Sequence, residues 1–146
     1  MRLVADARGT ASLEFAVAGV VITMLTLAIF DVGLLFMAQR GLDHGVNQAA
    51  RWAAVNSQSL SVASVLSQFQ AATAATIPDS GNCVGYAAGA NADPVVKCSI
   101  AVGFNPGTAP GGEISIQASY RWLPVSPVTG FRAAILQSSV KLGIQH

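Results

Sequence analysis

The hydrophobic residues of this chain gather near its N-terminus. Residues 15–30 read FAVAGVVITMLTLAIF, with no charged side chain, and after Asp31 the apolar run continues to residue 38. This length satisfies the ~20 apolar residues with which a helix crosses the hydrocarbon core of a bilayer. The alternative is a buried core helix, but a chain of 146 residues is too small to surround one on all sides. We therefore predict a transmembrane helix.

The helical pattern continues beyond this segment. Apolar positions at helical spacing are Leu42, Val46, Ala49, Ala50 and Ala53. A helix from residue 11 to about residue 55 would be ~65 Å long, roughly twice the thickness of the bilayer core. Its outer half must then pack on the head of the same chain or on other subunits.

Small residues form a row along the predicted helix. Gly33, Gly41, Gly45, Ala49 and Ala53 fall at multiples of four, a spacing that lets helix backbones approach closely. The three glycines are therefore candidates for helix packing. An ordinary alanine-rich helix with tolerated glycines is the alternative.

The rest of the chain predicts a small head. Residues 60–75 repeat apolar side chains at helical spacing, Pro78 ends that helix, and residues 82–94 have the composition of an exposed loop. Apolar and polar positions alternate in residues 95–104, 113–122 and 136–144. We expect an α+β fold, in which a long N-terminal transmembrane helix extends into a head with a second helix and a three-stranded antiparallel sheet.

The two cysteines flank the predicted loop. Cys83 and Cys98 form an even pair, and such a pair is oxidised outside the cytoplasm. Closing a loop of about 15 residues removes ~3 kcal/mol of unfolded-state entropy in the chain model. We expect a disulfide if the head lies in the periplasm, with two buried free thiols as the alternative.

Charge and composition exclude several function classes. Eight Lys and Arg residues against seven Asp and Glu residues leave a formal charge of +1, which argues against a nucleic-acid partner. Two cysteines and two histidines are too few for a His/Cys zinc site. The sequence contains no nucleophile, phosphate-loop or dinucleotide motif. We expect no catalytic residues, no metal and no cofactor, and a membrane-anchored enzyme is the least favoured class.

Two acids lie where lipid penalises them. Glu14 stands at the head of the apolar run and Asp31 stands inside it. A charge at mid-bilayer costs ~2.5–3.5 kcal/mol on insertion scales, so such a residue normally has a partner or a function. Glu14 could instead stabilise the helix N-terminus from the membrane interface. Asp31 is a candidate for helix packing, or lies near the outer water interface, about two turns before Arg40.

Around Glu14 the sequence resembles the processing site of type IV prepilins. Gly9 is followed by Thr10, three further residues, Glu14 and Phe15, and then by the apolar run. Residues 8–54 are similar to the TadE/TadG-like pseudopilins of tight-adherence pilus systems. The features that carry this resemblance are the pair Glu14–Phe15, the acid-x-Gly stretch 31–33 and the Ala-Ala-Arg stretch 49–51.

The resemblance implies processing and assembly. A prepilin peptidase would cut after Gly9, which leaves Thr10 as the new N-terminus and Glu14 as the fifth residue. The freed ammonium needs a counter-charge, and Glu14 of a neighbouring subunit can supply it and fix the register between helices. The implied organisation is a leader over 1–9, a transmembrane and extended helix over 10–56, and a periplasmic or extracellular α+β head over 57–146.

The function implied is that of a pilin-like structural subunit that supports pilus biogenesis, adhesion and surface colonisation. Its expected partners are other pilin or pseudopilin subunits, the prepilin peptidase, the inner-membrane assembly platform and membrane lipid. We expect a single-pass protein of the bacterial inner membrane with a periplasmic head, which enters an extracellular pilus on assembly. The alternative is an unprocessed, membrane-anchored envelope protein with a binding head.

Overall fold

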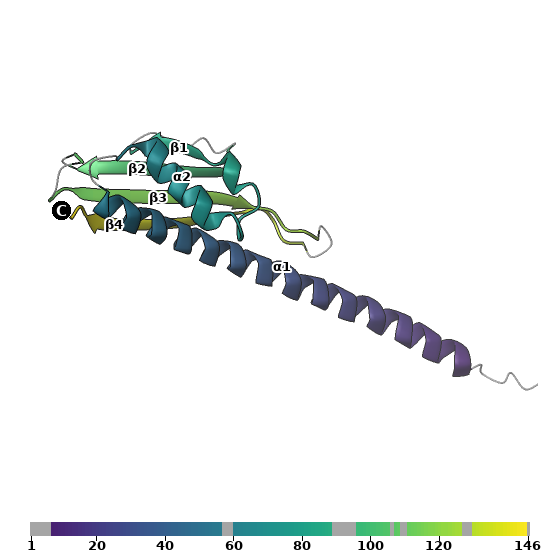
Figure 1. The fold of residues 1–146 in the computed structure, drawn as a ribbon. Coiled ribbons are helices and arrows are strands. Elements are labelled where there is room, and N and C mark those ends of the chain that lie inside the picture. The colour runs from purple at the N-terminus through teal and green to yellow at the C-terminus, as the bar shows by residue number, and fades with distance from the viewer. Residues whose placement is uncertain are drawn as a thin grey trace, which may run out of the picture.

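A long helix carries a small α+β head on its C-terminal half (Figure 1). The computed structural model describes residues 7–56, 60–88, 96–105, 107–108, 111–126 and 130–145, with side chains from residue 11 onward. The predicted α+β fold is confirmed, with one correction to the sheet.

Helix α1 (Ala7–Val55) is continuous over 49 residues, or about 73 Å at 1.5 Å per residue. The stretch 11–30 is exposed or half-buried all round, and the first buried residue of the described helix is Asp31. Beyond this point the head covers one stripe of the helix. Its buried members at helical spacing are Asp31, Ala38, Leu42, Val46, Ala49 and Ala53. The extension predicted from the apolar spacing therefore packs on the head of its own chain.

Helix α2 (Val62–Thr73) is fixed at its start by a capping box. The Ser64 amide donates to the Ser61 side chain at 3.1 Å, and the Ser61 amide donates to the Ser64 hydroxyl at 3.0 Å. Val65, Phe69 and Thr73 form its buried face. A short 3-10 helix, η2 (Ser80–Asn82), follows a turn at Pro78 and Asp79. The helix predicted over 60–75 is confirmed.

The sheet has the order β1-β2-β3-β4. Strands β2 (Cys98–Asn105), β3 (Glu113–Trp122) and β4 (Ala134–Gly143) are paired antiparallel and correspond to the three predicted strands. Along β3 the even-numbered residues from 114 to 122 are buried, as the alternation predicts. The alternation predicted this strand correctly because one face of the sheet packs on helices while the other faces solvent.

The prediction of three strands was wrong by one. Strand β1 (Val84–Ala87) lies in the stretch expected to be a loop and pairs parallel with β2. It has only four residues, none fully buried, and includes a glycine, so it carries no period-two signal. Tertiary contacts hold it instead, since the Gly85 backbone packs against Val62 and Leu66 of α2. Residues 89–94 of the expected loop lie outside the described residues.

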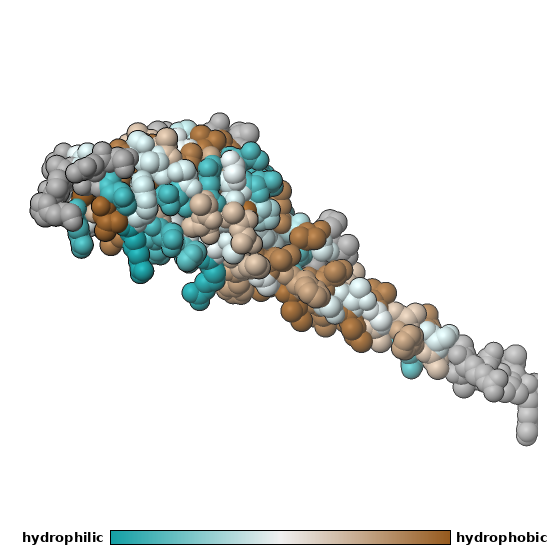
Figure 2. Space-filling view, viewed as in Figure 1, coloured by the Kyte–Doolittle hydropathy of each residue, from teal (hydrophilic) through white to brown (hydrophobic). Residues whose placement is uncertain are grey.

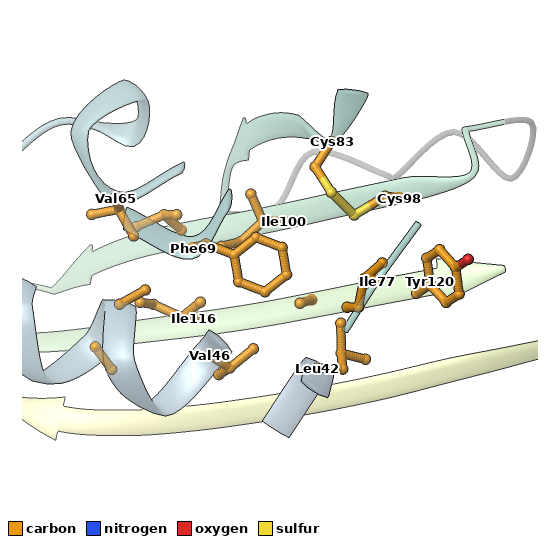
Figure 3. Packing of buried hydrophobic residues seen from close by; sticks show 14 of the residues in the cluster. Leu42, Val46, Val65, Phe69, Ile77, Cys83, Cys98, Ile100, Ile116 and Tyr120 are labelled. Carbon is orange, nitrogen blue, oxygen red and sulfur yellow. A yellow bond between two sulfur atoms is a disulfide. The ribbon is translucent and has the colours of Figure 1, made fainter. Parts of the chain in front are cut away.

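The core lies between the two helices and the inner face of the sheet (Figure 3). Phe69 of α2 is fully buried, and Leu42 and Val46 of α1 are equally inaccessible. Ile100 and Ile116 face them from the sheet (Figure 3). The C-terminal half of α1 therefore forms one wall of the core of the head.

Candidate functional site

The N-terminal part of α1 exposes an apolar surface on every side. Figure 2 shows hydrophobic residues along the shaft below the head. Large apolar side chains more than half exposed include Leu13, Phe15, Val17, Val20, Ile22, Leu25, Ile29, Phe30 and Phe36. Among the described residues there is one helix long and apolar enough to cross a membrane. An apolar helix that its own chain leaves uncovered needs lipid or other helices around it.

The predicted processing site lies at the start of α1. The backbone of Gly9 and Thr10 is helical, and their side chains lie outside the described residues. Glu14 and Phe15 are exposed one turn further on, with Phe15 81% exposed. Two ion pairs of the described residues, Lys97–Asp79 and Lys141–Glu113, both belong to the head. The Glu14 carboxylate therefore faces outward, where another molecule can reach it.

Asp31 is buried against the head. Its side chain is 1% exposed, and its Oδ1 accepts a hydrogen bond from the backbone N–H of Val125 at 3.0 Å. The sequence left open whether Asp31 takes part in helix packing or lies near the outer water interface, and the structure adds a partner in the chain's own head that neither alternative named. Arg40 is exposed, whereas the carboxylate faces the connection between β3 and β4. Sequence reasoning could not find this contact, because its two residues are 94 positions apart.

Two further hydrogen bonds tie α1 to the end of the chain. The Gln39 amide side chain donates to the Gln137 carbonyl of β4 at 3.2 Å. The Gln145 amide donates to the Ala54 carbonyl at 2.9 Å. Together with the Asp31 contact, these bonds connect α1 to the head at three levels, so helix and head form one unit from residue 31 onward.

The candidate packing glycines have different surroundings. A Cβ on Gly41 would overlap the Thr76 side chain, and one on Gly45 would overlap Thr73 and meet Phe69 at 3.0 Å. Gly41 thus lets α1 pack closely on the turn that follows α2, and Gly45 lets it pack closely on α2 itself. A Cβ on Gly33 would meet nothing within 4 Å. Of the three, Gly33 alone leaves α1 open to a neighbouring helix.

A disulfide joins Cys83 and Cys98, with their Cα atoms 4.6 Å apart. The expected bond is therefore present. Its position is informative, because the next residues along each segment, Val84 and Ser99, are the first pair of the parallel β1–β2 ladder. The disulfide thus anchors the edge strand that sequence reasoning missed.

Charged groups of the head form local pairs. Lys97 Nζ lies 2.6 Å from Asp79 Oδ2. The hydrogen bond to Asp79, assisted by the attraction between the charges, raises the pKa of the Lys97 ammonium above its usual value. Burial raises the pKa of the nearby Tyr120 phenol. Within the described part of the chain, no three His, Cys, Asp or Glu side chains gather as metal ligands would.

The comparisons with known proteins bear on the helix. Residues 9–51 match the family of TadE-like proteins. The N-terminal segment is TadE-like. The resemblance read from the Glu14–Phe15 pair and the stretches that follow is thereby confirmed. No curated protein and no solved structure matches the chain.

The TadE-like family is one of pilin-like subunits associated with tight-adherence pili. TadE-like proteins are structural components of such pili and are not known as an enzyme family. The apolar N-terminal helix fits a single-pass membrane protein. The match begins at Gly9 and ends at Arg51, and so it includes Glu14, Asp31 and all three candidate glycines.

Proposed function

We propose that this chain is a structural subunit that is anchored and assembled through its TadE-like helix. One observation carries the proposal. The segment that matches the family includes the apolar part of the helix that the head leaves uncovered. Such a surface serves first as a membrane anchor and then as a contact between subunits.

The proposed processing step is cleavage between Gly9 and Thr10 by a prepilin peptidase at the cytoplasmic face. Glycine leaves the backbone accessible at the cut. The products are a leader over residues 1–9 and a mature chain with helix 10–56 and head 57–146. Removing the leader frees an ammonium group on Thr10, one turn of helix from Glu14.

Glu14 then pairs with the Thr10 ammonium of a neighbouring subunit. An exposed carboxylate at the inner end of an apolar helix loses favourable hydration when helices bundle, and a partner charge offsets this loss. Phe15 lies beside it and adds apolar area to the same contact. The pair fixes the axial register between helices. Gly33, open on the helix surface, allows close approach further along.

The subunit lies in the bacterial inner membrane with its head in the periplasm, and enters an extracellular pilus on assembly. The Cys83–Cys98 disulfide supports this placement, because disulfides persist in the periplasm and are rare in the cytosol. The partners are sister subunits, the peptidase, the inner-membrane assembly platform and lipid. The assembled pilus supports adhesion and surface colonisation.

The test combines N-terminal mass spectrometry with a matched pair of variants. In cells that contain the peptidase, the mature chain should begin at Thr10. Glu14→Ala should still insert in the membrane but be lost from purified pili or from the assembly complex. Glu113→Ala, which removes an exposed carboxylate from the head, should assemble normally.

Two results would contradict the proposal. An intact Met1–Gly9 leader in those cells would favour the unprocessed envelope anchor. If Glu14→Ala assembles as well as Glu113→Ala, the proposed pairing of Glu14 with the Thr10 ammonium is contradicted. The role of the helix as a membrane anchor would be unaffected by that result.

A further inference from the structure

The connection between β3 and β4 presents apolar side chains to the outside. Val125 is 74% exposed, Leu123 is 51% exposed and Phe131 is 44% exposed. We call the described residues 123–126 and 130–133 the hairpin tip. Figure 1 shows that the described parts of this connection reach further along α1, toward its N-terminal end, than the rest of the head. An exposed apolar cluster at the extremity of a small head indicates a binding surface.

The contact with Asp31 fixes the level of the hairpin tip on the helix. Because the Val125 N–H donates to Asp31, Val125 lies at the height of that carboxylate. Asp31 is 17 residues beyond Glu14, which is about 26 Å along the axis. The hydrocarbon core of a bilayer is ~30 Å thick. With Glu14 at the inner interface, the Asp31 level falls just inside the opposite face of the core.

The charges around the hairpin tip fit this level. Arg121 precedes the tip, Arg132 lies within it, and both are exposed. Arg40 is exposed on α1, on the head side of Asp31. Apolar residues with arginines beside them are typical of surfaces that lie in the headgroup region, where the guanidinium groups reach the phosphates. The carboxylate at this level, Asp31, is turned inward and hydrogen-bonded to the tip.

A groove of about 140 Å³ lies between the tip and α1. Leu34 and Met37 of α1 line one side, and Trp122, Leu123 and Val125 contribute to the other. The exposed helix surface below and the groove are thus continuous and apolar. A lipid chain that covers the helix can cover this groove as well.

We propose that the hairpin tip enters the head-side leaflet of the membrane that α1 crosses, and contacts lipid through Val125, Leu123 and Phe131. The inference rests on the membrane-spanning role of α1 given above. It adds a second point of insertion, which sets the depth of the anchored subunit and holds the head against the membrane surface before assembly.

The test places single cysteines in the full chain. Val125→Cys and Leu123→Cys report on the tip, Ile29→Cys is the lipid reference, and Gln117→Cys, exposed on β3, is the water reference. The native cysteines are bonded to each other and do not react with a maleimide. Each variant is labelled with an environment-sensitive dye and reconstituted at high dilution in phosphatidylcholine–phosphatidylglycerol vesicles. Brominated lipids and aqueous iodide serve as quenchers.

The tip labels should show blue-shifted emission, quenching by brominated lipid at the level of Ile29→Cys, and protection from iodide. If the tip labels behave like Gln117→Cys while Ile29→Cys is in lipid, the tip proposal falls and the membrane anchor stands. If Ile29→Cys is also quenched by iodide, the anchor and the tip proposal fall together. Protection from both quenchers would show protein on the tip, a second copy of this chain, and would also overturn lipid contact.

Discussion

Asp31 is the one charged side chain among the buried residues that the structure describes. It lies where the uncovered helix ends and the head begins. A carboxylate at this level is costly unless hydrogen-bond donors satisfy it, and a backbone N–H from the hairpin tip does so. Asp31 therefore links the helix to the β3–β4 connection within the subunit through this hydrogen bond.

We expect Asp31→Ala to release that connection. The Val125 N–H would lose its acceptor in a partly buried site, at a cost of ~1–3 kcal/mol. Hydrogen exchange of the Val125 amide should become much faster, while exchange in β3 stays slow. Asp31→Asn keeps an acceptor oxygen and should remain close to the native chain. Equal exchange in the Ala variant and the native chain would show that the hydrogen bond does not hold the tip.

Tyr120 makes the stability of the folded chain depend on pH in the alkaline range. Burial raises the pKa of its phenol above the ordinary value of 10.0. Between the unfolded and the folded pKa, the unfolded chain has lost this proton while the folded chain retains it. The contribution of Tyr120 to the free energy of unfolding is therefore fully present below pH 10 and is lost as the pH rises through the folded pKa.

Absorbance at 295 nm measures this directly in Tyr86→Phe, where Tyr120 is the remaining tyrosine of the chain. We expect a midpoint above 10 in the folded protein and a return to about 10 in guanidinium chloride. A folded midpoint at or below 10 would contradict the burial effect.

At the scale of elements, the disulfide and the edge strand belong together. Cys83 and Cys98 precede the first β1–β2 pair, and Gly85 packs on α2. A four-residue strand on a sheet edge has few contacts of its own, so the covalent link supplies much of its order.

The double variant Cys83→Ser, Cys98→Ser should lose ~3 kcal/mol of stability in the chain-entropy model. Amides of β1 should exchange before those of β2–β4. Thermal unfolding and hydrogen exchange in detergent are the measurements. Simultaneous loss of protection in all four strands would show that β1 does not open independently.

We expect alanine substitutions at two glycines of α1 to change stability differently, because Gly45 faces α2 and Gly33 does not. Gly45→Ala should destabilise the head by ~1–3 kcal/mol, because the new methyl overlaps Thr73. Gly33→Ala meets open space and should leave stability unchanged or raise it by up to ~1 kcal/mol. Denaturant titration of both variants gives the comparison. A neutral Gly45→Ala would mean that α1 and α2 can separate without cost.

Sequence patterns predicted the elements that have strong periodicity. The helix over 60–75 and the alternation in 113–122 each bury one face, so their patterns record their packing. Strand β1 has no such face and was missed. The acid at Asp31 and the glycines at Gly41 and Gly45 were identified as unusual. Their partners were not, because each contact joins segments that only the folded chain brings together.

At the scale of the whole molecule, the uncovered shaft and the disulfide support the proposal that the two ends lie in different surroundings. The head should lie outside the cytoplasm. A membrane-impermeant maleimide should therefore label Gln117→Cys in intact spheroplasts, since this side chain is exposed on β3. Labelling that requires lysis would reverse the proposed orientation.

The unbroken course of α1 has a mechanical consequence. Residues 7–55 form one rod, and its upper half is a wall of the head core. No hinge separates the two halves, so a head cannot turn about its shaft. In the assembly proposed above, a rotation between the helices of two neighbouring subunits would therefore also rotate their heads, and a force on a head would act directly on its helix.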